Sequence, residues 1–119
     1  MASARRILVV EDQFLIAMEL EAILQGAGYV VLGPAPTVSV ALDLIHREPP
    51  DAALLDANLA GERVTPVAEV LRASSIPFLL ASGYEARDLS GDRALRDAVN
   101  VGKPVVAKRL LAELAGLFV

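Results

Sequence analysis

Two short apolar runs in this sequence each end in acidic residues, and this repeated pattern limits the folds that the chain can adopt. Residues 7–10 are followed by Glu11 and Asp12, and residues 52–55 are followed by Asp56. An unbroken apolar run is typical of a strand in a parallel sheet that helices cover on both faces. Open α/β sheets bind their ligands at the carboxyl ends of such strands. The sequence therefore predicts three carboxylates near one edge of an α/β sheet.

Apolar runs and helical patterns alternate along the chain. Five runs are predicted strands, of which the last is the weakest: residues 6–10, 29–32, 52–55, 77–81 and 98–101. Apolar spacings of three and four predict helices at residues 13–25, between the N-cap Thr37 and the Pro49-Pro50 pair, from Val64 or Thr65 to Ala73, and at residues 106–117. The polar stretch 84–97 predicts at most a short, frayed helix. Such alternation produces a parallel sheet with right-handed crossovers.

The composition restricts the functions that are open to the chain. Its 119 residues, 55% of them hydrophobic, suit one domain, residues 1–119, with a sizeable core. Its 15 acidic and 11 basic residues disfavour a nucleic-acid partner, because such binding depends on clustered Lys and Arg. It has no cysteine for a disulfide or a thiolate zinc site, and no apolar stretch approaches the ~18 residues that span a bilayer. We therefore expect a cytoplasmic protein that binds neither nucleic acid nor membrane.

The three predicted carboxylates need a neighbour that stabilises them. A cluster of acids is unfavourable unless a cation neutralises it or one acid is protonated. Carboxylate oxygens are hard ligands that suit Mg²⁺ or Ca²⁺, so the cluster predicts a metal site. Each acid alone also has a simpler interpretation, with Glu11 and Asp12 as caps of the helix that follows and Asp56 as a turn residue.

Two later strand ends add different chemistry at the same edge of the sheet. Ser82 follows the fourth predicted strand, and Lys103 follows the fifth. Together with the acids, they provide a nucleophile, ligands for a divalent cation, a hydroxyl donor and an ammonium group that offsets anionic charge. This set is sufficient for transfer of a phosphoryl group to a carboxylate.

The order Glu11-Asp12, Asp56, Ser82, Lys103-Pro104 resembles the receiver domain of two-component response regulators, and the resemblance covers essentially the whole chain. It implies a flavodoxin-like fold, in which a doubly wound, five-stranded parallel sheet of strand order 2-1-3-4-5 has helices on both faces. Residues 76–84, Ile-Pro-Phe-Leu-Leu-Ala-Ser-Gly-Tyr, further resemble the single-domain subgroup with the signature P-F-x-F-A-T-G-Y.

The resemblance also implies a role for each residue of the site. Asp56 is then the phosphoacceptor, and Ser82 and Lys103 contact the phosphoryl group. Mg²⁺, for which Ca²⁺ or Mn²⁺ can substitute, is then held by Glu11, Asp12, Asp56 and the backbone carbonyl of Asn58.

Three further residues are expected to modulate the switch. The bond between Lys103 and Pro104 is usually cis in this family. Asn100 stands three residues before the lysine, where receivers with an aromatic switch carry Tyr or Phe. Tyr84 is the nearest aromatic residue that could report the phosphorylated state instead.

The implied function is that of a stand-alone receiver and not of an enzyme. Because the last predicted helix ends at the chain terminus, we expect no output domain. A sensor histidine kinase or a phosphotransfer protein would supply the phosphoryl group. The chain would then either bind an unknown downstream protein or serve as a phosphate sink or relay.

Two alternatives stay open. The first is a small hydrolase with an aspartyl-phosphate intermediate, although Asn58 stands where such phosphatases place a second carboxylate. The second is a degenerate receiver that binds its partner without phosphorylation, which Asn100 suggests.

Overall fold

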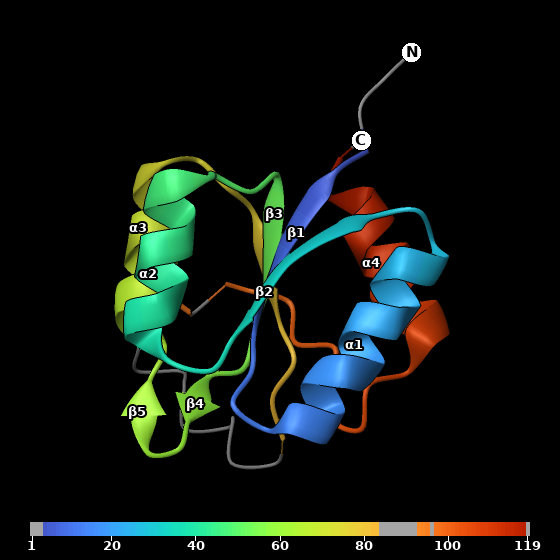
Figure 1. Ribbon diagram of the computed structural model, residues 1–119, viewed down its shortest axis with the longest axis horizontal. Coiled ribbons are helices and arrows are strands. Elements are labelled where there is room, and N and C mark those ends of the chain that lie inside the picture. The colour runs from blue at the N-terminus through green and yellow to red at the C-terminus, as the bar shows by residue number, and fades with distance from the viewer. Residues whose placement is uncertain (1–3, 84–92, 96, 119) are drawn as a thin grey trace.

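A parallel sheet of four strands forms the centre of the structure, a computed structural model that describes residues 4–83, 93–95 and 97–118 (Figure 1). The strands lie in the order β2-β1-β3-β6. Their bounds are Arg6–Val10 for β1, Val30–Ala35 for β2, Ala52–Leu55 for β3 and Phe78–Leu80 for β6. The predicted flavodoxin-like α/β fold is confirmed, because the strand order runs 2-1-3-4 when the four strands are counted along the chain.

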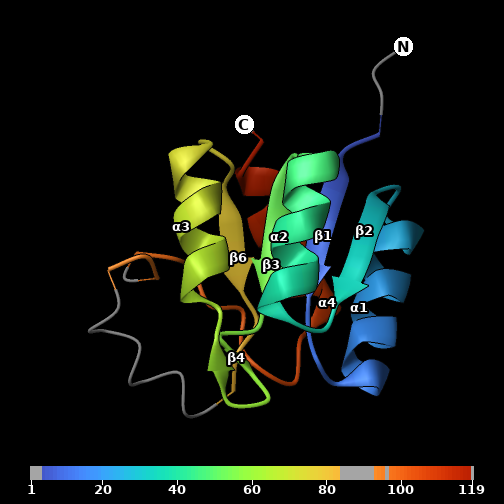
Figure 2. The same ribbon diagram turned by 60° about the vertical axis from the view of Figure 1, so that its left-hand side comes forward.

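Helices cover both faces of this sheet. Helices α2 (Val38–Arg47) and α3 (Thr65–Ala73) pack on one face, and α1 (Phe14–Gly26) and α4 (Ala107–Gly116) pack on the other (Figures 1 and 2). Alternate residues of a strand point to opposite faces. Leu8 and Val10 accordingly join the core beside α2 and α3, whereas Ile7 and Val9 join the core beside α1 and α4. Burial on both faces explains why the run is unbroken in the sequence.

The predicted helices agree with the structure to within a few residues at their ends. The predicted cap of α2 is confirmed, since the Thr37 side chain accepts a hydrogen bond of 3.2 Å from the Val40 N–H. Pro66 lies in the first turn of α3, where a proline is tolerated because that N–H has no helical partner. The weak helix predicted in residues 84–97 lies largely outside the described residues. Within that stretch, residues 93–95 are described and form a turn.

Strand β2 is longer than the predicted 29–32, because Gly33 and Pro34 interrupt its sequence pattern without ending the strand. Gly33 has φ +94°, and the pairing of β1 with β2 shifts register between Leu8 and Val10. A Cβ atom at Gly33 would lie 2.7 Å from the Ala35 nitrogen and 2.9 Å from the Val9 carbonyl oxygen. Glycine is therefore required at this irregularity.

The prediction of a fifth strand at residues 98–101 is wrong. This segment forms only one parallel bridge with the sheet, between Asn100 and Leu80 of β6. Leu80 donates to the Val99 carbonyl and accepts from the Val101 N–H, both at 2.8 Å. The chain then turns away at Gly102, whose φ is +81°, so the pairing does not extend further.

A short hairpin that the sequence pattern did not predict follows β3. It consists of β4 (Asn58–Leu59) and β5 (Glu62–Arg63), which pair in antiparallel orientation. Ala60 and Gly61 between them both have positive φ, 51° and 89°, as a tight two-residue hairpin turn requires. Figures 1 and 2 show the hairpin at the end of the molecule where the parallel strands terminate. Among the described residues, each helix is too short or too polar to cross a membrane.

Candidate functional site

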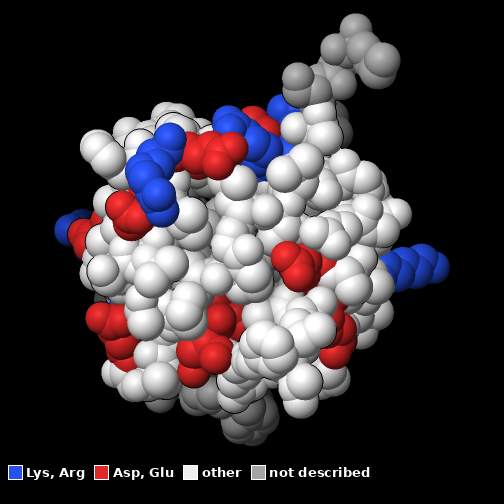
Figure 3. Space-filling model, in the orientation of Figure 1, with Lys and Arg blue, Asp and Glu red and all other residues white. Residues whose placement is uncertain are grey.

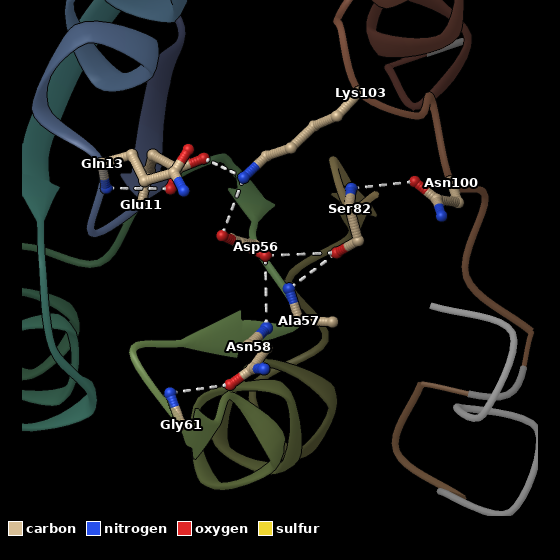
Figure 4. Close-up of polar contacts among 9 residues, drawn as sticks. All are labelled: Glu11, Gln13, Asp56, Ala57, Asn58, Gly61, Ser82, Asn100 and Lys103. Atoms are coloured by element: carbon tan, nitrogen blue, oxygen red, sulfur yellow. Dashed lines mark hydrogen bonds and ion pairs between the residues drawn. The ribbon is translucent and has the colours of Figure 1, made fainter. Parts of the chain in front are cut away.

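Asp56 lies at the carboxyl end of the central strand β3, and the sheet fixes its position. Its backbone N–H donates to the Val10 carbonyl at 2.9 Å, and the Ala81 N–H donates to the Leu55 carbonyl at 2.8 Å. These bonds align the ends of β1, β3 and β6. The side chains that follow each strand, Glu11, Asp56 and Ser82, therefore lie at one edge (Figure 4), and all three residues are buried.

Both oxygens of the Asp56 carboxylate have donors nearby. Oδ2 lies 2.9 Å from the Lys103 ammonium. Oδ1 accepts a bond of 3.2 Å from the Asn58 N–H and a longer one, 3.4 Å, from the Ser82 hydroxyl. The Ser82 oxygen itself accepts a bond of 2.7 Å from the Ala57 N–H. Asp56 is thus a buried carboxylate surrounded by hydrogen-bond donors.

Lys103 joins the two deeply buried acids of the site. Its Nζ lies 2.8 Å from Glu11 Oε1 as well as 2.9 Å from Asp56 Oδ2. Burial raises the pKa of Glu11 above its ordinary value; the hydrogen bond with Lys103 opposes this rise only in part, and the charge on Asp56 adds to it. Burial alone would lower the pKa of Lys103, but the bonds with Glu11 and Asp56 outweigh that effect and raise it. The two acids therefore favour the charged form of Lys103.

The three acids fit a divalent cation. One carboxylate oxygen each from Glu11, Asp12 and Asp56 lie within 4.8 Å of one another. Glu11 Oε1 is buried, and its one polar partner among the described residues is the Lys103 ammonium at 2.8 Å, so it can still accept a further ligand. Asp12 is half-buried and gives the cluster access to solvent. Oxygen ligands of this kind and charge suit Mg²⁺.

The surface around this edge is also acidic. Figure 3 shows Asp and Glu side chains on the lower part of the face drawn, at the end where the strands terminate. Lys and Arg side chains on that face lie toward the top and at the left and right edges. Acidic side chains at this end of the molecule favour the approach of a cation.

The structure brings together the predicted residues Glu11, Asp12, Asp56, Ser82 and Lys103. The bond between Lys103 and Pro104 is cis, as predicted. Asn58 begins β4, where its side-chain Oδ1 accepts from the Gly61 N–H at 3.0 Å. Its backbone carbonyl stays a predicted metal ligand. Tyr84, the predicted aromatic reporter, lies outside the described residues.

Sequence reasoning missed two features of the site. The first is the backbone N–H of Ala57, which holds the Ser82 hydroxyl. The second is the contact made by Asn100, whose Oδ1 accepts from the N–H groups of Ser82, at 3.1 Å, and Gly102, at 2.9 Å. The bond to Gly102 closes an Asx-turn, which Asn commonly forms with the N–H group two residues ahead. The Asn-x-Gly pattern was therefore a usable signal, whereas the bond to Ser82 depends on the tertiary structure.

Comparison with known proteins adds relatives of this chain. No family model matches it. It is 34% identical over 104 residues to the phyllosphere-induced regulator PhyR of Methylorubrum extorquens, an alignment that covers 85% of this chain and 39% of PhyR. The chain therefore spans about two fifths of that curated relative's length.

Two solved structures are similar over nearly all of the chain. SdrG from Sphingomonas melonis Fr1 is 42% identical with a TM-score of 0.83, and the match covers 100% of both chains. The PhyR response regulator REC domain of Erythrobacter litoralis is 26% identical with a TM-score of 0.86, covering 98% of this chain and 91% of that one. These matches run almost from end to end, so the likeness covers the whole fold.

Proposed function

This chain belongs to the receiver domains of response regulators, and on that premise we propose that Asp56 accepts a phosphoryl group from a sensor histidine kinase or a phosphotransfer protein. One observation carries the proposal: the Asp56 carboxylate is buried at a strand end with a lysine ammonium on one oxygen and hydrogen-bond donors on the other. A purely structural aspartate needs neither the second buried acid, Glu11, nor the half-buried Asp12 beside it.

The proposed step is a displacement at phosphorus. An oxygen of Asp56 attacks the phosphorus of a phosphohistidine, a P–O bond forms as the P–N bond breaks, and the bonding electrons stay on the imidazole of the donor. Negative charge then moves from the carboxylate to the phosphoryl oxygens. The Lys103 ammonium, 2.9 Å from Asp56 Oδ2, offsets that charge. The hydroxyl of Ser82 and the N–H groups of Ala57 and Asn58 are donors that the phosphoryl oxygens can share.

Mg²⁺ is the proposed cofactor, with Ca²⁺ or Mn²⁺ as substitutes. Glu11, Asp12 and Asp56 would hold it, together with the Asn58 carbonyl. When bound, the ion would neutralise phosphoryl oxygens during the transfer. Glu11 is also the ion-pair partner of Lys103, so it keeps that ammonium beside Asp56.

The proposed output is a protein signal. We assign the chain to the stand-alone receivers, which the end-to-end match with SdrG supports. Within them we assign it to the P-F-x-F-A-T-G-Y subgroup, on the sequence of the tract 76–84 alone. The protein would act in the cytoplasm. Phosphorylation would either change its affinity for a downstream protein or remove phosphoryl groups from a kinase, so that the chain serves as a phosphate sink. Partner binding with and without phosphorylation separates the two, because an unchanged affinity indicates the sink.

Intact mass spectrometry tests the proposed step directly. After incubation with acetyl phosphate and Mg²⁺, the wild type should gain one phosphoryl group, and Asp56→Asn or added chelator should abolish the gain. Asp43→Asn is a matched control, because Asp43 is an exposed acid of α2, paired with Arg47. A wild type that gains nothing, or a gain that persists in Asp56→Asn, contradicts the proposal. Sustained hydrolysis of small phosphoesters would indicate the hydrolase alternative instead.

A further inference from the structure

Asn100 connects two segments of the site, which we call its arms: the loop after β6 that carries Ser82, and the turn that leads to Lys103. Its backbone lies in the single bridge beside β6, where Leu80 bonds to both Val99 and Val101 at 2.8 Å. Its side-chain Oδ1 accepts from the N–H groups of Ser82 and Gly102, at 3.1 and 2.9 Å. One oxygen atom therefore connects the loop after β6 with the turn before Lys103.

Each arm ends in a side chain that contacts Asp56. The first arm carries the Ser82 hydroxyl, 3.4 Å from Asp56 Oδ1. The second arm carries the Lys103 ammonium, 2.9 Å from Asp56 Oδ2, directly after Gly102. Neither arm belongs to a regular strand at this point, since β6 ends at Leu80 and the chain beyond Asn100 is a turn. The two bonds to Asn100 thus replace the ladder bonds that would hold these backbones in a longer strand.

We propose that Asn100 is a positioning residue for phosphoryl acceptance: its amide oxygen fixes the Ser82 backbone and the Gly102 turn relative to each other, which keeps the hydroxyl and the ammonium on Asp56. The proposal rests on the proposed function. It also gives a reason for the absence of Tyr or Phe at this position. An aromatic side chain has no acceptor close to its Cβ, so it could not bind these two N–H groups, and Ser82 is a buried residue whose N–H needs a partner.

Two substitutions separate the acceptor oxygen from the size of the side chain. Asn100→Leu has nearly the same shape and no acceptor, whereas Asn100→Asp keeps an oxygen in the same place. In acetyl phosphate and Mg²⁺, Asn100→Leu should take up the phosphoryl group about tenfold more slowly than the wild type, the factor expected from the loss of hydrogen bonds at a reacting site. Asn100→Asp should stay within about threefold. If Asn100→Leu does not fold, Asn100→Ala carries the same expectation.

Amide hydrogen exchange tests the two bonds without any phosphorylation. Asn100→Leu should lose protection at the N–H groups of Ser82 and Gly102, and Asn100→Asp should keep it. Leu80 and Val101 are internal controls, because their N–H groups bond to backbone carbonyls and not to the Asn100 side chain. Equal loss at all four amides would mean that the edge of the sheet has opened, and it would overturn the assignment to the amide oxygen.

A double-mutant cycle separates positioning from a merely structural role. In Ser82→Ala, one of the two arms no longer has its functional group. Adding Asn100→Leu should then slow uptake by only about threefold, compared with about tenfold in the wild type. If Asn100→Leu slows uptake by the same factor in the wild type and in Ser82→Ala, the positioning role is overturned. It is also overturned if the wild type takes up phosphate and Asn100→Leu takes it up at the same rate. A wild type that takes up no phosphate contradicts the proposed function itself, and the positioning role falls with it.

Discussion

Lys103 lies between two buried carboxylates, and its replacement by methionine has an effect that can be worked out from the structure. Its Nζ is 2.8 Å from Glu11 Oε1 and 2.9 Å from Asp56 Oδ2, and the Glu11 and Asp56 side chains are 1% and 9% exposed. Lys103→Met keeps the length of the side chain but leaves two facing acids without a cation. Removal of one partner from a buried ion pair costs about 3–5 kcal/mol. Because the Lys103 side chain is 17% exposed, we expect the lower end, about 3 kcal/mol.

That loss is measurable by urea unfolding followed by circular dichroism in the presence of a chelator. A domain of ordinary stability, about 5–15 kcal/mol, remains folded after it. Added Mg²⁺ should stabilise Lys103→Met more than it stabilises the wild type, because in the variant the ion neutralises acids that no lysine neutralises. Lys108→Met, at an exposed position of α4, is the matched control and should change stability by less than about 0.5 kcal/mol.

A second substitution tests the reasoning about charge. Glu11→Gln combined with Lys103→Met removes one of the two acids, so the double variant should be more stable than Lys103→Met alone by about 1 kcal/mol or more. A double variant that is as unstable as the sum of the single variants would refute the reasoning. A Lys103→Met variant within about 0.5 kcal/mol of the wild type would refute it as well.

Three further predictions concern the metal and the frame of the site. Mg²⁺ should raise the melting temperature of the wild type, and Asp12→Asn should reduce that increase at equal Mg²⁺ concentration, because a ligand that binds only the folded state stabilises it; an equal increase in both would exclude Asp12 as a ligand. Gly33→Ala should destabilise by about 2–4 kcal/mol in urea unfolding because its Cβ meets backbone atoms at 2.7 and 2.9 Å. Gly26→Ala, with open space around its Cβ, is the control and should not destabilise. Thr37→Ala should cost about 1 kcal/mol through the lost cap of α2, and Thr37→Ser should restore most of it.

The strands that the sequence predicted well are those buried on both faces. In β1 and β3 every residue but Arg6 is buried, so the apolar run marks the strand directly. The pattern failed where a neighbouring strand decides the pairing. Strand β2 continues through Gly33 and Pro34 because β1 shifts register beside it, and no local feature of residues 33–35 indicates this. The stretch 98–101 reads as a strand but forms one bridge, because the turn at Gly102 ends its pairing.

The sequence by itself determined which residues reach the site, because parallel strands that start together also end together, and the residue after each strand then lies at one edge. Glu11 and Asp56 follow from that rule directly, and Ser82 lies one residue further on, because β6 ends at Leu80. Only the tertiary structure decided how these groups are connected. The bond from Lys103 to Glu11 and the junction at Asn100 join residues more than fifteen positions apart in sequence, with distances of 2.8 and 3.1 Å. Such contacts depend on the relative positions of loops in the folded protein, and the pattern of residues along the sequence does not specify those positions.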